Sequence, residues 1–150
     1  MPEAHGPESA LADTELADSE LTGGFRASMP FAEVLGIEVL SASPEAVRVR
    51  SAWEERLCTA GGILHGGALM GIADAAGAYC AFLNLPEGST GTATIESKTN
   101  FFRAVRDGHV VAMSRPLHRG RTTIVVETDL HDAEGRHVAR VTQTQAVLAG

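Results

Sequence analysis

The pattern of apolar and polar residues predicts that the folded part of the chain contains two early β-strands. Residues 37–43 and 46–53 are rich in β-branched side chains, and a Ser-Pro-Glu turn separates them. Valine and arginine alternate over residues 47–50, which is typical of a strand with one buried face. Upstream, apolar residues recur at nearly helical spacing, so we expect a short helical or irregular segment over residues 25–35.

The next segment predicts one long helix over residues 68–83. It contains no proline, consists mostly of Ala, Leu, Met and Ile, and follows a glycine-rich stretch at residues 61–67. Because this helix is apolar nearly all round, we expect both of its faces to be covered. At about 100° per residue, one face carries Leu69, Ile72, Ala76, Cys80 and Leu83, and the opposite side carries Gly67, Met70, Asp74, Ala78 and Ala81.

Four further strands are predicted after the helix. Strand-like stretches at residues 90–105, 109–117, 122–131 and 136–148 are separated by turn sequences that contain glycine. A single sheet covers both sides of one helix only if the sheet curls around it. The alternative is that a second copy of the chain covers the side that is left.

Length and charge describe one domain with an acidic extension. The chain has 150 residues, of which 44% are hydrophobic, and its formal net charge is -7. Residues 1–24 hold six acids and no Lys or Arg, which leaves 13 acids against 12 bases in the remainder. We therefore expect a disordered acidic tail over residues 1–24 and one folded domain over residues 25–150. A nearly neutral domain disfavours nucleic acid as a partner.

Several other classes of protein are disfavoured. No apolar run approaches the ~20 residues that span a bilayer, and the N-terminus lacks the order of a secretory signal, so we expect a soluble cytoplasmic protein without a membrane partner. Cys58 and Cys80 belong to no C-x-x-C motif or Cys/His cluster, so reduced thiols and no metal site are expected. Nucleotide-binding motifs are absent, and no cofactor is expected.

Asp74 is an acid inside the apolar helix. No basic residue occurs between Arg56 and Lys98, so no neighbour on the helix can neutralise it. Because burying an unpaired charge is costly, Asp74 lies on a wet face, accepts hydrogen bonds from neighbouring backbone, or has a chemical role. A carboxylate is largely ionised at neutral pH and can act as a general base.

The start of the helix offers a complementary group. His65-Gly66-Gly67 precedes the helix, where exposed N–H groups can cradle an oxyanion, although the glycines can equally serve only a tight turn. Asp74 lies about 12 Å farther along the helix axis. One chain cannot easily aim both groups at one carbonyl, but two such helices packed antiparallel about a two-fold axis can. Dimerisation and catalysis therefore form one hypothesis.

The stretch HGGALMGIAD, from His65 to Asp74, resembles the HGG-then-acid signature of hotdog-fold acyl-CoA thioesterases. The likeness extends over about residues 30–147 through LGIE, NFFRAVRDG and PLHRGR. These motifs resemble the group that contains the phenylacetate-degradation and 4-hydroxybenzoyl-CoA thioesterases. The resemblance implies an α+β hotdog fold, in which a curved antiparallel sheet wraps around one long central helix. It also implies homodimers or homotetramers, active sites shared between subunits, and hydrolysis of an acyl-CoA substrate to free acid and CoA.

The resemblance also assigns roles by position. Asp74 matches the catalytic carboxylate, as general base or nucleophile, and Gly66 matches the glycine whose N–H polarises the thioester carbonyl. His65 matches the histidine of the motif, and Gly67 is expected beside the substrate. Thr94 occupies a place where some relatives use a hydroxyl to hold the water, although a strand threonine can equally be structural.

The chain departs from the family pattern at two positions. Thr59 stands six residues before the histidine, where relatives commonly place Asn or Gln to orient the thioester. We expect its hydroxyl to take over this role with a shorter reach. Ala78 stands where some aromatic-acyl enzymes have Ser or Thr.

A basic segment provides the second functional signal. Residues 98–121 hold six Lys and Arg against one acid, a local balance of +5. Clustered arginines suit phosphate recognition, although Lys98 and Arg115 are expected simply to face solvent. The resemblance implies contacts to the nucleotide end of CoA from Arg103, Arg106, His118, Arg119, Gly120 and Arg121.

Two other functions remain open from the sequence. A non-catalytic acyl-CoA-binding hotdog protein would have the same fold, and Thr59 in place of Asn or Gln leaves room for it. An acyl-thioester hydratase or dehydratase would need a paired histidine and acid, which His65 keeps open.

Overall fold

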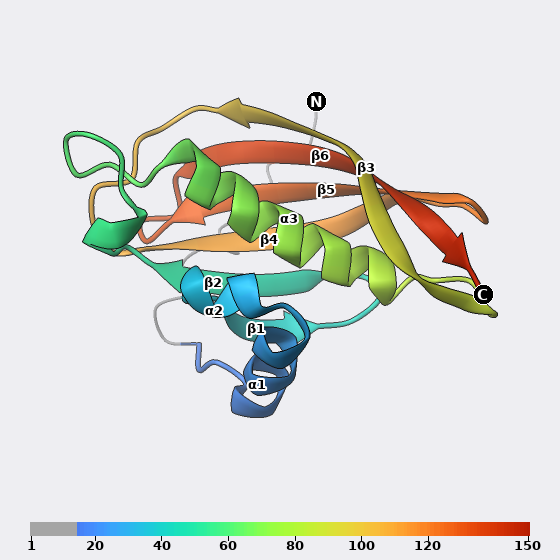
Figure 1. The fold of residues 1–150 in the computed structure, drawn as a ribbon. Helices are drawn as coiled ribbons and strands as arrows, with labels where there is room; N and C mark the ends of the chain where they lie inside the picture. The colour runs from blue at the N-terminus through green and yellow to red at the C-terminus, as the bar shows by residue number, and fades with distance from the viewer. Residues whose placement is uncertain (1–14) are drawn as a thin grey trace, which may run out of the picture.

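The computed structural model describes residues 15–150 and shows an antiparallel sheet packed on one long helix (Figure 1). The six strands follow the order β1-β2-β4-β5-β6-β3. The helical elements are α1 (Ser19–Ser28), α2 (Pro30–Val34), the 3-10 turn η1 (Glu55–Leu57) and α3 (Gly66–Phe82). The strands are β1 (Glu38–Ala42), β2 (Val47–Ala52), β3 (Ser89–Phe101), β4 (His109–Arg119), β5 (Thr123–Asp132) and β6 (His137–Ala149). The predicted order of strands and long helix is confirmed.

The core lies between α3 and the sheet. α3 contacts β2 to β6, and the alternation along β5 places Ile124 and Val126 beneath it, both fully buried. Ile72 and Cys80 on the predicted apolar face of α3 are also fully buried. Ala81 was expected beside Asp74 on the opposite side, but it is buried too, because buried positions extend around more than half of the helix.

The two edge strands of the sheet differ. At β1, the outer edge is covered by α1: the Val39 N–H donates to Thr22 Oγ1, and the Asp18 N–H donates to Val39 O, both at 2.9 Å. At the other end, β3 pairs only with β6 among the described strands. Ile95 and Phe101 on β3 are 63% and 50% exposed. A long edge strand with exposed apolar residues is a ready surface for pairing with another chain.

The N-terminal boundary differs from the expected one. Residues 1–14 of the expected tail lie outside the described residues, but residues 19–24 belong to α1. Asp18 caps this helix by accepting a hydrogen bond from the Leu21 N–H, and Phe25 packs edge to face on Tyr79 of α3. The acids that suggested disorder include this cap and Glu15, which pairs with Arg48.

Candidate active site

The helix α3 begins with an open amide at Gly66. His65 is the N-cap residue, and its Nδ1 accepts the Gly67 N–H at 2.8 Å, so a neutral His65 ring carries its proton on Nε2. Gly67 therefore has its N–H engaged within its own chain. The Gly66 N–H is the first amide of the helix and has no carbonyl one turn earlier to bind. Of the two glycines, Gly66 is the one that offers a free donor.

The position of Gly66 leaves no room for a larger residue without adjustment. A Cβ at this position would lie 3.1 Å from Cζ of Phe101, whose half-exposed ring comes from the end of β3. The amide-lined start of α3 is therefore bordered by an aromatic side chain. Thr59 lies at the same end of the fold, exposed in the loop before α3, where its N–H donates to Ile63 O.

Asp74 lies on the exposed side of α3, where the helix crosses β3 and β6. Its Oδ1 accepts hydrogen bonds from Thr94 Oγ1 of β3 and Gln143 Nε2 of β6, each at 3.2 Å. Gln145 Nε2 donates in turn to Thr94 Oγ1 at 2.7 Å. These donors are neutral, so the carboxylate is oriented by the sheet without being neutralised by it. The structure thus brings Thr94 and Asp74 together, as expected for two residues of one site.

The two glutamines were not identified from the sequence. Gln143 and Gln145 are 1% and 0% exposed, although glutamine is normally a surface residue. A signal for them was present, because they continue the inward-facing alternation of Val141 on β6, where an apolar residue is expected. Polar residues at inward positions of a strand therefore marked this site.

Gly66 and Asp74 are not brought together within one chain. Eight residues of continuous α3 separate them, which corresponds to about 12 Å. His65 directly precedes Gly66, so it lies at nearly the same distance from Asp74. Its Nδ1 already accepts the hydrogen bond from the Gly67 N–H. The paired histidine and acid of a hydratase is therefore not formed in the described chain.

The basic segment is divided between two ends of the sheet. Arg103 and Arg106 lie in the connection before β4, next to the start of α3, where Arg106 Nη1 donates to Gly61 O. Arg119 closes β4 at the other end, near the end of α3, and donates to Pro44 O. Figure 1 shows β4 running between these two ends of the sheet. Its eleven residues correspond to a length of about 35 Å. One chain therefore does not present them to one phosphate.

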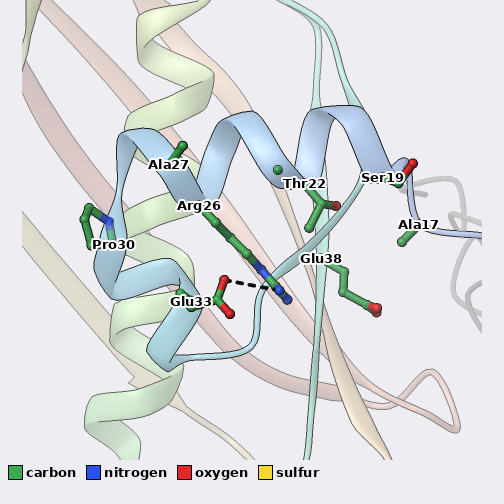
Figure 2. Close-up of a pocket in the computed structure, with 9 residues that line it drawn as sticks. Ala17, Ser19, Thr22, Arg26, Ala27, Pro30, Glu33 and Glu38 are labelled. Carbon is green, nitrogen blue, oxygen red and sulfur yellow. Dashed lines mark ion pairs between the residues drawn. The ribbon is translucent and has the colours of Figure 1, made fainter.

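Two cavities lie among the described residues 15–150 at places away from Asp74. A groove of about 720 Å³ lies beside α1, α2 and β1, and Figure 2 shows Arg26 and Glu33 paired across it. A smaller cavity of about 330 Å³ is lined by Arg103 and Arg106 together with Arg136 and three acids. Asp74 instead lies on the open side of α3.

The described residues contain no group of three or more side chains suited to hold a metal ion. None of the described helices is long and apolar enough to cross a membrane.

Comparison with known proteins identifies the family to which this chain belongs. The profile of the Thioesterase superfamily matches residues 61–139, which include Gly66, Asp74 and Thr94. PA1618 of Pseudomonas aeruginosa is 30% identical over 120 residues, which cover 79% of this chain and 83% of PA1618. The crystal structure of a mutant of thioesterase PA1618 matches with a TM-score of 0.80 at 27% identity, covering 86% of this chain and 94% of that one.

Two further relatives have names that state an activity. The proofreading thioesterase EntH of Cronobacter turicensis is 29% identical over 116 residues, covering 77% of this chain and 84% of EntH. The 1,4-dihydroxy-2-naphthoyl-CoA hydrolase of Escherichia coli is 32% identical over 87 residues, covering 58% of this chain and 63% of that enzyme. As the HGG-then-acid motif predicted, the chain belongs to the hotdog-fold Thioesterase superfamily and is a thioester hydrolase.

Proposed function

We propose that the protein hydrolyses an acyl-CoA thioester to a free acid and CoA, with Asp74 as the catalytic carboxylate. The observation that carries this proposal is an exposed carboxylate on α3 whose Oδ1 is held by β3 and β6. A carboxylate fixed in this way can accept a proton or attack an acyl carbon. The CoA hydrolase among the relatives supports CoA as the carrier of the acyl group.

Two mechanisms account for all the atoms and protons of this reaction. As a general base, Asp74 takes a proton from water while the water oxygen bonds to the carbonyl carbon, and the C–S bond then breaks. As a nucleophile, Asp74 attacks the carbonyl carbon and displaces the CoA thiolate, and water hydrolyses the mixed anhydride. In both routes the thiolate takes up a proton. Negative charge develops on the carbonyl oxygen in both, so an N–H donor aimed at that oxygen accelerates either route.

The donor in this proposal is the Gly66 N–H of a second subunit. In a two-fold dimer with antiparallel α3 helices, the start of one helix lies beside the third turn of the other. The uncovered side of α3 supports this arrangement, since Met70 is 40% exposed there next to Asp74. The open edge of β3, with Ile95 and Phe101, supports it as well, because exposed apolar patches mark interaction surfaces.

The same dimer accounts for the divided basic segment. Arg103 and Arg106 lie near the start of α3. The last two residues of β4, His118 and Arg119, lie near its end, and Gly120 and Arg121 follow in the turn to β5. When two α3 helices run antiparallel, opposite ends of the two subunits meet. One CoA nucleotide is then expected to contact arginines from both chains.

Thiol release tests the reaction. We expect the native protein to release free thiol from at least one of a short-chain, a medium-chain and a phenylacetyl-CoA substrate. Asp74→Asn keeps the shape of the side chain and should lose about 10²–10⁴-fold in kcat. Equal background rates for both proteins would contradict the catalytic assignment. Tight CoA-ester binding by the native protein without release would favour the non-catalytic binding protein instead.

The donor role of Gly66 has its own test. Gly66→Pro removes the N–H while suiting the first position of a helix, and the extended His65 backbone (φ -62, ψ 136) accepts a following proline. Gly66→Ala is the matched control, because it adds a Cβ beside Phe101 but keeps the N–H. We expect kcat of the proline variant to fall about 10²–10³-fold below that of the alanine variant. Equal kcat values would remove Gly66 from the mechanism.

A further inference from the structure

We propose that Gln143 and Gln145, the two buried glutamines of β6, are positioning residues that hold Asp74 by Oδ1 and leave Oδ2 as the reacting oxygen. This inference rests on the proposed function and adds the assignment of one carboxylate oxygen. Both hydrogen bonds to the Asp74 side chain end on Oδ1. Within residues 15–150, Oδ2 receives none, and Asp74 is an exposed residue of α3.

The donor and the acceptor in each of these hydrogen bonds can be assigned by starting from the Asp74 carboxylate. An ionised carboxylate only accepts, so Gln143 must present its NH₂ group and Thr94 its hydroxyl proton. A hydroxyl has one proton, so Gln145 must donate to the Thr94 oxygen from its own NH₂ group. The Thr94 proton is thereby committed to Asp74. Thr94 consequently acts as an anchor of the carboxylate and does not donate a hydrogen bond to the attacking water.

The side-chain carbonyl oxygens of both glutamines show that these residues are not placed to satisfy all of their own hydrogen-bonding groups. The carbonyl oxygens of Gln143 and Gln145 are buried and have no hydrogen-bond partner among the described residues. Buried polar atoms without partners are rare and costly, and they concentrate where function requires them. Only the donor ends are used, and they serve Asp74 directly or through Thr94.

A glycine on α3 makes the arrangement possible. Gly77 lies one turn after Asp74 and faces Gln143 so closely that a Cβ would lie 2.6 Å from Cδ of Gln143, and closer still to its Oε1. The absence of a side chain at Gly77 thus allows the amide to lie against the helix. From there, Nε2 of Gln143 reaches both the side chain and the backbone oxygen of Asp74, at 3.2 and 3.5 Å.

Kinetics of conservative variants test the positioning role. Gln143→Met and Gln145→Met keep the volume and remove the donor, and we expect kcat to fall about 10- to 100-fold with KM within about twofold, because the carboxylate loses its aim. Thr94→Ser should retain more of kcat than Thr94→Val, because serine keeps the hydroxyl. Thr128→Val is the control, since it removes a buried hydrogen bond to Ser114 away from Asp74 and should leave kcat unchanged. Native kcat in both methionine variants would overturn the proposal.

A second readout does not depend on turnover. In ¹⁵N-labelled full-length protein, the side-chain NH₂ signals of Gln143 should shift in Asp74→Ala, and those of Gln145 should shift less, through Thr94. Unchanged Gln143 signals would overturn the positioning inference even if the enzyme is active. If the signals shift in Asp74→Ala but the native protein releases no thiol, the proposed function is overturned, together with the assignment of Oδ2.

Discussion

Gly77→Ala tests whether the packing behind Asp74 controls catalysis. In a helix interior, replacing glycine by alanine normally raises stability by about 1 kcal/mol. At Gly77 the new methyl group would overlap the Gln143 amide, which would have to retreat by roughly 1 Å to the 3.4 Å where ordinary van der Waals contact begins. Such overpacking costs about 1–3 kcal/mol, so we expect the free energy of unfolding to fall by up to about 2 kcal/mol.

Gly71→Ala on the same helix is the matched comparison. A Cβ at Gly71 would lie 3.1 Å from the ends of the Phe31 and Leu35 side chains, of which the exposed Phe31 can move by a few tenths of an ångström. We expect the helix-propensity gain to compensate there, with little or no loss of stability. Gly71 also contacts neither glutamine, so its substitution leaves the anchor of Asp74 in place.

The assay combines urea unfolding with thiol release for both variants. Displacing Gln143 removes one of two hydrogen bonds to Asp74 Oδ1, so kcat of Gly77→Ala should fall about 10- to 100-fold below that of Gly71→Ala. If Gly77→Ala were as stable as Gly71→Ala and turned over at the native rate, the packing of Gln143 against Gly77 would have no role in holding Asp74. A stability loss without a change in kcat would show that Gln143 packs against α3 without aiming Asp74.

Three other expectations concern separate parts of the fold. Burial raises the pKa of the Cys80 thiol from 9.0 to about 11, so a thiol reagent at pH 8 should label half-buried Cys58 first. The free energy of unfolding should fall as pH rises from 9 toward 11, because the unfolded chain loses the Cys80 proton first. Prompt labelling of Cys80 in the folded protein would contradict this. Burial raises the pKa of Asp132, but hydrogen bonds from the Arg136 backbone and side chain outweigh it and lower that pKa. Asp132→Ala should therefore lower the free energy of unfolding by about 1–3 kcal/mol in urea at pH 7, and by less as pH falls through that pKa. A loss that does not change with pH would contradict this. Arg121→Ala should raise KM more than it lowers kcat, and equal effects would argue against a CoA contact.

Periodicity predicted the elements that pack by their own pattern. β5 and α3 carry their apolar residues at strand and helix spacing, so their positions followed from the sequence within a few residues. α1 did not follow, because its stability depends on a cap at Asp18 and on Phe25 packing against Tyr79, far along the chain. Tertiary contacts of this kind leave no periodic signal in a short acidic segment.

The sequence indicates candidate residues for the site better than it indicates how they are arranged. An acid within an apolar helix and a glycine-rich helix start predict roles for Asp74 and Gly66, and these roles stay predictions. Gln143 and Gln145 were missed because they belong to no motif, and only their inward positions on β6 distinguish them. Arg106 and Arg121 looked like one basic cluster because they are close in sequence, but an antiparallel strand carries its two ends apart.

Mixing two inactive variants tests the shared active site most directly. In a dimer that joins one Asp74→Asn chain to one Gly66→Pro chain, one site has both defects and the other has both native groups. Random exchange of subunits makes about half of the dimers mixed, so we expect recovery of about a quarter of native thiol release. No recovery in a verified mixed dimer would show that the carboxylate and the amide do not act across subunits.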